Sequence, residues 1–236
     1  GLTLRLLSRG AEYVFLSFPG AVRRMGGRRR KVVGTPIRKT MGRVDRSEAR
    51  KQFGLDPGRQ TLLITGASQG SVSMNQAVGE ALPILMRQDL QVLWQGGQTD
   101  PAPAQIAKNW PGRAMVVPFI DDMAAAYSAA DVAVTRSGAL TLTELAHIGL
   151  PAILIPLPWS AENHQEHNAR ALEEAGAGRV ILQADLDGEG LAETVMTLLA
   201  DGEGLRQMAE CSRALAVPDA ADRLVEDMAK VGLCDG

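Results

Sequence analysis

The sequence predicts an α/β protein built around a doubly wound parallel β-sheet. From about residue 46, short apolar runs such as 61–65 and 131–134 alternate with segments of helical periodicity. These runs lack the polar alternation of a half-exposed strand, which is typical of a parallel sheet covered by helices on both faces. The 236 residues are 45% apolar, which is enough to form a sizeable core.

The expected elements follow from this pattern and from local stop signals. Gly54 and Gly176 each end a helical pattern, and Pro36 stops any helix after the strand at 31–34. Asp121 and Asp122 open a helix, because their negative charge complements the helix dipole. We expect strands at 13–17, 31–34, 61–65, 91–95, 114–117, 131–134, 152–155 and 179–182. We expect helices at 2–9, 46–53, from the turn at 66–71 to about 85, and at 102–109, 121–129, 163–175, 187–200, 203–214 and 219–231, with a further helix over the apolar pattern 140–148 that follows Gly138.

Composition argues against several classes of function. The net charge of −2 gives no electrostatic reason to expect nucleic acid as a partner. Cys211 and Cys234 have no ligand-like spacing, so a reduced, intracellular protein is the default. The three histidines, His147, His164 and His167, form no recognisable metal signature. We therefore predict neither a metal nor a cofactor.

No membrane-spanning helix or signal peptide is visible in the sequence. The longest uncharged run, residues 145–161, is interrupted by three prolines. The chain does not begin with Met, and it opens in the middle of an apolar pattern. We therefore expect that it has been cut from a longer protein.

The stretch Thr135–Glu144 is the strongest candidate for a ligand site. A strand enters a turn at Ser137-Gly138 and a helix leaves it, which aims unpaired N–H groups and a helix dipole at a bound phosphate or diphosphate. The hydroxyls of Ser137 and Thr141 add possible donors, and the Glu144 carboxylate could reach a sugar hydroxyl. The alternative is an ordinary strand–helix turn that happens to contain a glycine.

Two further loops belong to the same edge, since ligands of parallel sheets bind beyond the carboxyl ends of the strands. The turn at 66–71 also joins a strand to a helix through glycines, but it lacks the lysine of a Walker loop. In the loop at 156–165, Gln165 could hydrogen-bond vicinal sugar hydroxyls together with Asn168, although such a loop can equally cap a helix. Two phosphate-type turns and a polar loop together predict a nucleotide-sugar site.

The residues do not form a hydrolytic site. Ser68 is not in a Gly-x-Ser-x-Gly elbow, and the adjacent Asp121 and Asp122 diverge on a helix.

A basic glycine-containing loop is expected at 23–31, either as a solvated loop or as a contact with anionic lipid head groups.

Taken in order, the motifs identify a family. The chain resembles, over residues 1 to about 231, the carboxyl-terminal half of the MurG-type N-acetylglucosaminyltransferases of glycosyltransferase family 28. The residues that carry the resemblance are Gly34–Arg38, Gly66–Gly70 with Asn75, Phe119–Met123, Arg136–Thr141 with Glu144, Gly149–Ala152, and His164-Gln165 with Asn168-Ala169. Thr35 stands where the family usually has asparagine, and Ala67 where glycine is common.

The resemblance implies a GT-B fold and a place in peptidoglycan synthesis. Residues 1–30 would be a remnant of the acceptor lobe, 31–218 the nucleotide-sugar-binding lobe, and 219–236 a helix packing back toward the amino-terminal lobe. The implied reaction is an inverting, metal-independent transfer of N-acetylglucosamine from UDP-N-acetylglucosamine to undecaprenyl-diphosphate-muramyl-pentapeptide, converting lipid I to lipid II. It implies peripheral association with the cytoplasmic face of the bacterial membrane.

The resemblance also implies a role for each site residue. Ile120 would bind the uracil through its backbone, and Glu144 would accept from the ribose hydroxyls. Ser68 and the turn Ser137-Gly138-Ala139-Leu140-Thr141 would hold the diphosphate, with Arg38 near it. Gln165 would read the sugar hydroxyls together with Asn168.

The catalytic base would lie in the amino-terminal lobe, so none is expected in this chain, which should bind the donor weakly without turnover. Two alternatives remain open: a stand-alone nucleotide-sugar-binding subunit that needs a membrane partner, or another GT-B glycolipid glycosyltransferase that differs around Gln165.

Overall fold

The computed structural model describes residues 2–17, 26–66 and 70–232. The chain divides into two compact units, which we call unit 1 (Gly1–Lys39 with Ala216–Gly236) and unit 2 (Thr40–Leu215). The first division lies nine residues after the expected boundary at 30/31, and the second lies three residues before the one at 218/219.

Unit 2 is built on a six-stranded sheet in which every neighbouring pair is parallel. The strand order is β5-β4-β3-β6-β7-β8. The strands are β3 (Gln60–Thr65), β4 (Leu90–Gln95), β5 (Ala114–Val117), β6 (Val132–Thr135), β7 (Ala152–Leu154) and β8 (Arg179–Val180). The order runs outward from β3 in one direction and from β6 in the other, so the doubly wound parallel sheet is confirmed.

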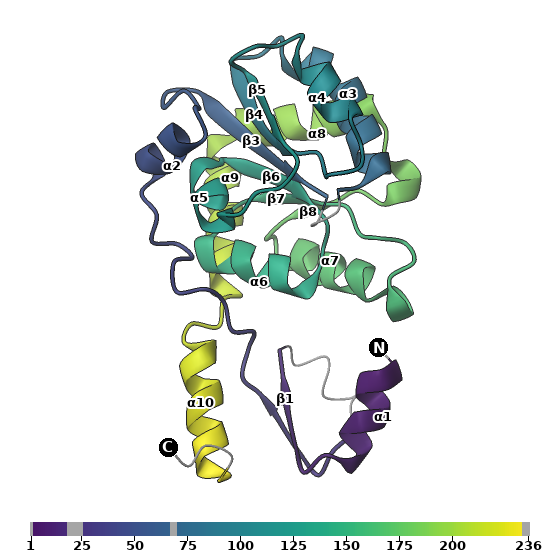
Figure 1. The fold of residues 1–236 in the computed structure, drawn as a ribbon, viewed down its shortest axis with the longest axis vertical. Coiled ribbons are helices and arrows are strands. Elements are labelled where there is room, and N and C mark those ends of the chain that lie inside the picture. Colours follow the sequence, from purple (N-terminus) through teal and green to yellow (C-terminus); the bar gives the residue numbers. More distant parts are fainter. Residues whose placement is uncertain (1, 18–25, 67–69, 233–236) are drawn as a thin grey trace. The chain divides into compact units, whose positions relative to one another are not determined.

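Helices cover both faces of this sheet (Figure 1). Helices α3 and α8 pack together, as do α2 with α5 and α6 with α9. The α-helices of unit 2 are α2 (Arg46–Gln52), α3 (Val72–Leu85), α4 (Ala102–Ala107), α5 (Met123–Ala129), α6 (Ala139–Ile148), α7 (His164–Glu174), α8 (Gly188–Ala200) and α9 (Gly202–Ala214). Two 3₁₀ turns, Ala161–Asn163 and Gln183–Asp185, follow β7 and β8.

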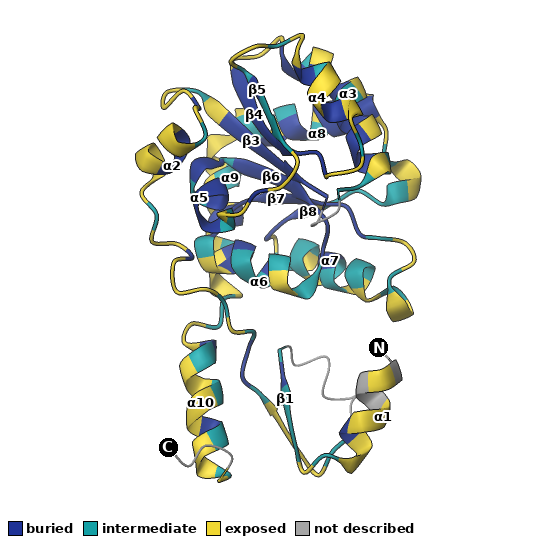
Figure 2. Cartoon of the chain, viewed as in Figure 1, coloured by how far each residue is buried: buried dark blue, intermediate teal, exposed yellow. Residues whose placement is uncertain are grey.

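The core lies between the sheet and these helices, and Figure 2 shows the central strands as buried. All six residues of β4 are buried, and so are all four of β6. Leu62 and Ile64 of β3 pack in one cluster with residues of α3 and α8, which is why the strands show no polar alternation. This sheet is therefore a rigid platform for the loops at its carboxyl edge.

Unit 1 contains a parallel pair of strands and two helices. Strand β1 (Tyr13–Leu16) pairs with β2 (Arg29–Val32), and the helices are α1 (Leu2–Gly10) and α10 (Ala220–Lys230). Lys31 of β2 forms an ion pair of 2.6 Å with Asp227 of α10. Gly34 has a φ of +89°, and a Cβ there would lie 2.9 Å from the Val217 side chain, so this position requires glycine.

The expected strands and helices of unit 2 are present, with ends within two residues of those predicted. The basic loop expected at 23–31 is wrong for Arg29–Lys31, which form part of β2, and its first residues, 23–25, lie outside the described residues. Backbone pairing with β1 sets this strand despite its exposed basic side chains. Among the described residues, no helix is long and apolar enough to cross a membrane.

Candidate functional site

The candidate site lies where the strand order reverses. Strands β3 and β6 are neighbours, and the chain leaves them toward opposite sides of the sheet. In such sheets a crevice forms at this point beyond the carboxyl ends of the strands. The loops after β3 and β6 are the two glycine turns that the sequence singled out.

The turn after β6 presents unpaired backbone donors. Gly138 is the N-cap of α6 and offers no side chain to cap the helix. The N–H groups of the first turn, Ala139 to Thr141, have no partner within the helix and carry the positive end of its dipole. Leu140 is 52% exposed, and Thr141 is half-buried. This geometry suits an anion such as a diphosphate.

A buried cation lies directly before this turn. Arg136 is 7% exposed and donates to the carbonyl oxygens of Ile155 (3.1 Å) and Pro156 (3.3 Å). It also donates to Ser71 Oγ (2.6 Å) and Gln183 Oε1 (2.7 Å). Every partner that the described residues give it is a neutral oxygen, and burial lowers the pKa of its guanidinium. Its positive charge is therefore available to a bound anion.

Sequence reasoning placed Arg136 in a motif but gave it no role. The available signal was a charged residue between a fully apolar strand and a glycine turn. A charge in that position must be buried beside the ligand site, because the strand end is buried.

The hydroxyl of Ser137 has a different role from the one expected. Ser137 is fully buried, and its Oγ donates to the backbone oxygen of Gln165 at 2.8 Å. The Asn168 amide also reaches the Ser137 carbonyl, at 3.5 Å. In this structure the side chain of Ser137 therefore ties the turn to the start of α7 instead of facing a ligand.

Gln165 is half-buried at the beginning of α7. Its Oε1 accepts from the Leu157 N–H at 3.0 Å, and its own backbone N–H donates to Ser160 Oγ at 3.2 Å. The side chain thus holds the start of the loop that precedes it, which is neither the sugar contact nor the helix cap considered from the sequence. Its amide nitrogen remains suited to donate to a sugar hydroxyl.

Glu144 is half-buried on α6 and pairs with a residue that the sequence did not single out. The Tyr127 hydroxyl donates to Glu144 Oε2 at 3.2 Å. Burial and the neighbouring carboxylate raise the pKa of Tyr127, so its hydroxyl stays protonated and holds Glu144 in place. No sequence pattern could have found this pair, because the two residues lie on different helices.

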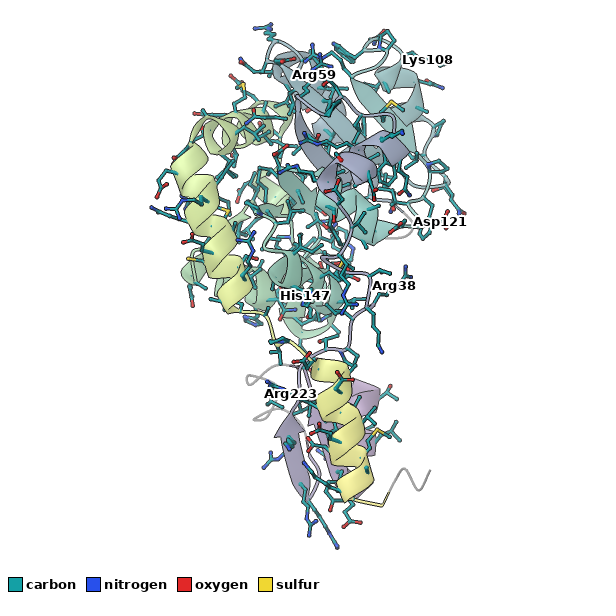
Figure 3. The ribbon with its side chains drawn as sticks, turned by 90° about the vertical axis from the view of Figure 1, so that its left-hand side faces the viewer. Arg38, Arg59, Lys108, Asp121, His147 and Arg223 are labelled. Atoms are coloured by element: carbon teal, nitrogen blue, oxygen red, sulfur yellow. The ribbon has the colours of Figure 1, made fainter. Side chains whose placement is uncertain are left out.

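Ile120 follows β5, and its backbone N–H already has a partner. It donates to Oε1 of Gln95, a buried residue at the end of β4, at 3.0 Å. A uracil read by this backbone would have to displace Gln95 or use the Ile120 carbonyl. The next residue, Asp121, is exposed and is labelled in Figure 3.

Gly70, at the end of the turn after β3, is packed tightly against the loop after β4. Gly70 has a φ of +79°, and a Cβ there would lie 2.6 Å from the Gly96 oxygen. Asn75 of α3 donates to that oxygen and to Asp100 Oδ2, both at 2.8 Å. Ser68, expected to bind the diphosphate, lies outside the described residues.

Arg38 belongs to unit 1, whereas the other candidates belong to unit 2. Its side chain is exposed, and Figure 3 labels it. Its predicted place near the diphosphate remains a prediction. Within residues 2–17, 26–66 and 70–232, no three His, Cys, Asp or Glu side chains are grouped to hold a metal ion.

Comparison with known proteins identifies the family of this chain. The family described as "Glycosyltransferase family 28 C-terminal domain" matches residues 61–224. A relative from Desulfitobacterium hafniense (strain Y51) is 40% identical, with 95% of this chain and 63% of the relative covered. One from Alkalilimnicola ehrlichii is 43% identical, with 94% and 61% covered. Both are named UDP-N-acetylglucosamine--N-acetylmuramyl-(pentapeptide) pyrophosphoryl-undecaprenol N-acetylglucosamine transferase.

A solved structure shows the same fold. The crystal structure of MurG from Acinetobacter baumannii has a TM-score of 0.76 and 32% identity, with 98% of this chain and 63% of that chain covered. The chain thus spans somewhat less than two thirds of the length of these relatives. The expected carboxyl-terminal lobe of a GT-B fold is confirmed, and the chain belongs to glycosyltransferase family 28 through that family's C-terminal domain.

Proposed function

We propose that unit 2 holds UDP-N-acetylglucosamine as the donor for transfer of N-acetylglucosamine to undecaprenyl-diphosphate-muramyl-pentapeptide. The names of the relatives from Desulfitobacterium and Alkalilimnicola support this donor and acceptor. The observation that carries the proposal is the turn after β6, where the uncapped N-terminus of α6 and the buried Arg136 meet. Both features favour a diphosphate.

The turn also fits the chemistry of glycosyl transfer. When an acceptor hydroxyl attacks the anomeric carbon and gives its proton to a base that we expect outside this chain, the bond to the diphosphate breaks and negative charge grows on the leaving UDP. The dipole of α6 contributes about 0.3–1 kcal/mol to an anion there, and up to about 2 kcal/mol where it is partly buried. Each charge-assisted hydrogen bond from an N–H adds about 1.5–3 kcal/mol.

The remaining donor contacts follow from the same site. Glu144, held by Tyr127, would accept from the ribose hydroxyls, and the Gln165 amide would donate to a sugar hydroxyl. The alternatives, a stand-alone binding subunit or another glycolipid glycosyltransferase, differ in partner or in sugar.

Calorimetric titration tests the donor. We expect UDP-N-acetylglucosamine to bind more tightly than UDP-glucose or UDP-galactose, and UDP to compete with it. Equal affinity for all three sugars would assign the chain to a different glycosyltransferase activity. Absence of binding by UDP itself would contradict the nucleotide-sugar site.

Peripheral association with the cytoplasmic face of the membrane is part of the proposal. The exposed basic side chains of β2, Arg29 to Lys31, support contact with anionic head groups. We expect the chain to sediment with phosphatidylglycerol vesicles and not with phosphatidylcholine vesicles at low salt. Equal recovery with both lipids would contradict an electrostatic contact.

A further inference from the structure

The loop between β7 and α7 is fixed at both ends to the candidate site. At its start, Arg136 donates to the carbonyl oxygens of Ile155 and Pro156. At its end, Ser137 Oγ donates to the backbone oxygen of Gln165. The two anchors come from consecutive residues of the turn that we assign to the diphosphate. What lies between them, residues 157–163, therefore borders the donor site.

Between the anchors, the segment bonds to itself and to the first turn of α7. Ser160 N donates to Leu157 O (3.1 Å), and Asn163 N donates to Ser160 O (2.8 Å). The Gln165 backbone N–H donates a hydrogen bond to Ser160 Oγ. The Asn163 amide also donates to Glu166 Oε2 at 2.5 Å, and His164 Nδ1 lies 2.7 Å from the Ala161 oxygen, so all of these contacts are local to the segment and the start of α7.

Trp159 lies within this segment and is exposed. Its side chain is 77% exposed, although tryptophan is usually highly buried. A large aromatic side chain beside a sugar-binding position is suited to cover that sugar.

The end of the segment is strained in this conformation. Glu162 and Asn163 both have a φ of 54°, in the left-handed region that residues with a Cβ rarely adopt. Asparagine tolerates this region, whereas glutamate does not favour it. Strain at the junction with α7 is typical of a segment with a second accessible conformation.

A single side chain links the segment to the donor. Gln165 Oε1 holds the Leu157 N–H, and Gln165 is also the residue proposed to read the sugar hydroxyls. If both the oxygen and the nitrogen of the Gln165 side-chain amide bond to the sugar, the hydrogen bond from the Leu157 N–H is lost. We propose that residues 157–163 form a lid, which closes Trp159 over the sugar of the donor when Gln165 exchanges Leu157 for a sugar hydroxyl. This inference rests on the proposed donor site.

Tryptophan fluorescence tests the lid, because the chain has three tryptophans and Trp94 is fully buried. We expect saturating UDP-N-acetylglucosamine to shift the emission to shorter wavelength, as Trp159 leaves water. UDP, which lacks the sugar, should cause no shift. The variant Trp159→Phe should bind but lose the response, which assigns the shift to this residue and not to Trp110.

A backbone variant tests the strain. Glycine adopts a positive φ without cost, so Glu162→Gly should stabilise the open segment and weaken UDP-N-acetylglucosamine binding about threefold or more. Its affinity for UDP should not change. Glu162→Gln is the matched control, since it removes the charge but keeps the strained Cβ, and it should bind both ligands like the parent.

The possible failures can be told apart. If calorimetry shows that UDP-N-acetylglucosamine binds but the emission does not shift, the donor site stands and the lid is refuted. A shift of equal size with UDP also refutes it, because the trigger would not be the sugar. If calorimetry shows no binding of either ligand, the proposed function fails, and the lid fails with it.

Discussion

The pair formed by Glu144 and Tyr127 gives a quantitative test of the ribose site. Replacing Glu144 by alanine removes a half-buried carboxylate and leaves the buried Tyr127 hydroxyl without this acceptor. The substitution should therefore weaken nucleotide binding and also lower stability. The two effects have different causes and can be separated.

The expected magnitudes follow from the contacts. A hydrogen bond to a charged group contributes about 1.5–3 kcal/mol, so Glu144→Ala should weaken UDP binding roughly 10- to 150-fold. An unpaired buried hydroxyl costs about 1–3 kcal/mol of stability. Adding Tyr127→Phe removes that hydroxyl, so the double variant should regain stability without regaining affinity. Tyr127→Phe alone keeps the carboxylate and should retain most of the affinity.

Calorimetry with two ligands identifies the group that Glu144 contacts. UDP and 2′,3′-dideoxy-UDP differ only in the ribose hydroxyls. If the carboxylate accepts from these hydroxyls, Glu144→Ala weakens binding of UDP but not of the dideoxy compound. An equal loss of affinity for both nucleotides would refute the ribose assignment, and thermal unfolding of each variant provides the stability values.

Three further predictions concern charges elsewhere in unit 2. Arg136→Gln should weaken UDP binding by about 1–3 kcal/mol in calorimetry and leave uridine binding unchanged. Arg136→Lys keeps the charge and should lose less affinity for UDP. Equal losses for UDP and uridine would contradict a role of Arg136 toward the diphosphate. Asp131→Ala removes the carboxylate that accepts from the buried Arg50 at 2.8 Å, so urea unfolding should show a loss of about 3 kcal/mol, against less than about 1 kcal/mol for the control Arg46→Ala. Equal losses would contradict a buried ion pair. The Ser47 hydroxyl and the backbone N–H groups of Glu48 and Ser47 lower the pKa of Asp45 from 3.8. The carboxylate therefore contributes to the free energy of unfolding above pH 3.8, and this contribution is lost as the pH falls through the lower pKa of the folded state. The stability difference from Asp45→Asn should therefore shrink below pH 3.8, and a constant difference would contradict the cap.

Much of the fold was predictable because its signals are local. The apolar runs of β3, β4 and β6 could only be buried strands, and the alternation with helices indicated a parallel sheet. Strand β2 was missed in part, because exposed arginines carry no apolar pattern and the strand depends on pairing with β1. Likewise, no local signal places Glu162 in the left-handed region.

The candidate site, like the fold, could be predicted only in part. The turn after β6 was predictable, since a strand, a glycine and a helix follow one another in the chain. The direction of the Ser137 hydroxyl was not, because its acceptor is 28 residues away. The Gln95 side chain that takes the Ile120 N–H is 25 residues away and is chosen by the pairing of β4 with β5. Side-chain roles thus depended on tertiary partners that the sequence does not reveal.

The two glycine turns differ in a way that bears on rate as well as affinity. Helix α3 begins with Ser71, whose hydroxyl caps Met74 and also accepts from Arg136, whereas α6 begins uncapped. Arg136 thus donates to Ser71 at the turn after β3, while its charge lies beside the turn after β6. A leaving UDP carries one more negative charge than the diphosphate of the bound nucleotide sugar. In the proposed transfer, fixed positive groups at α6 would therefore stabilise the transition state more than the ground state, and that difference would accelerate the reaction.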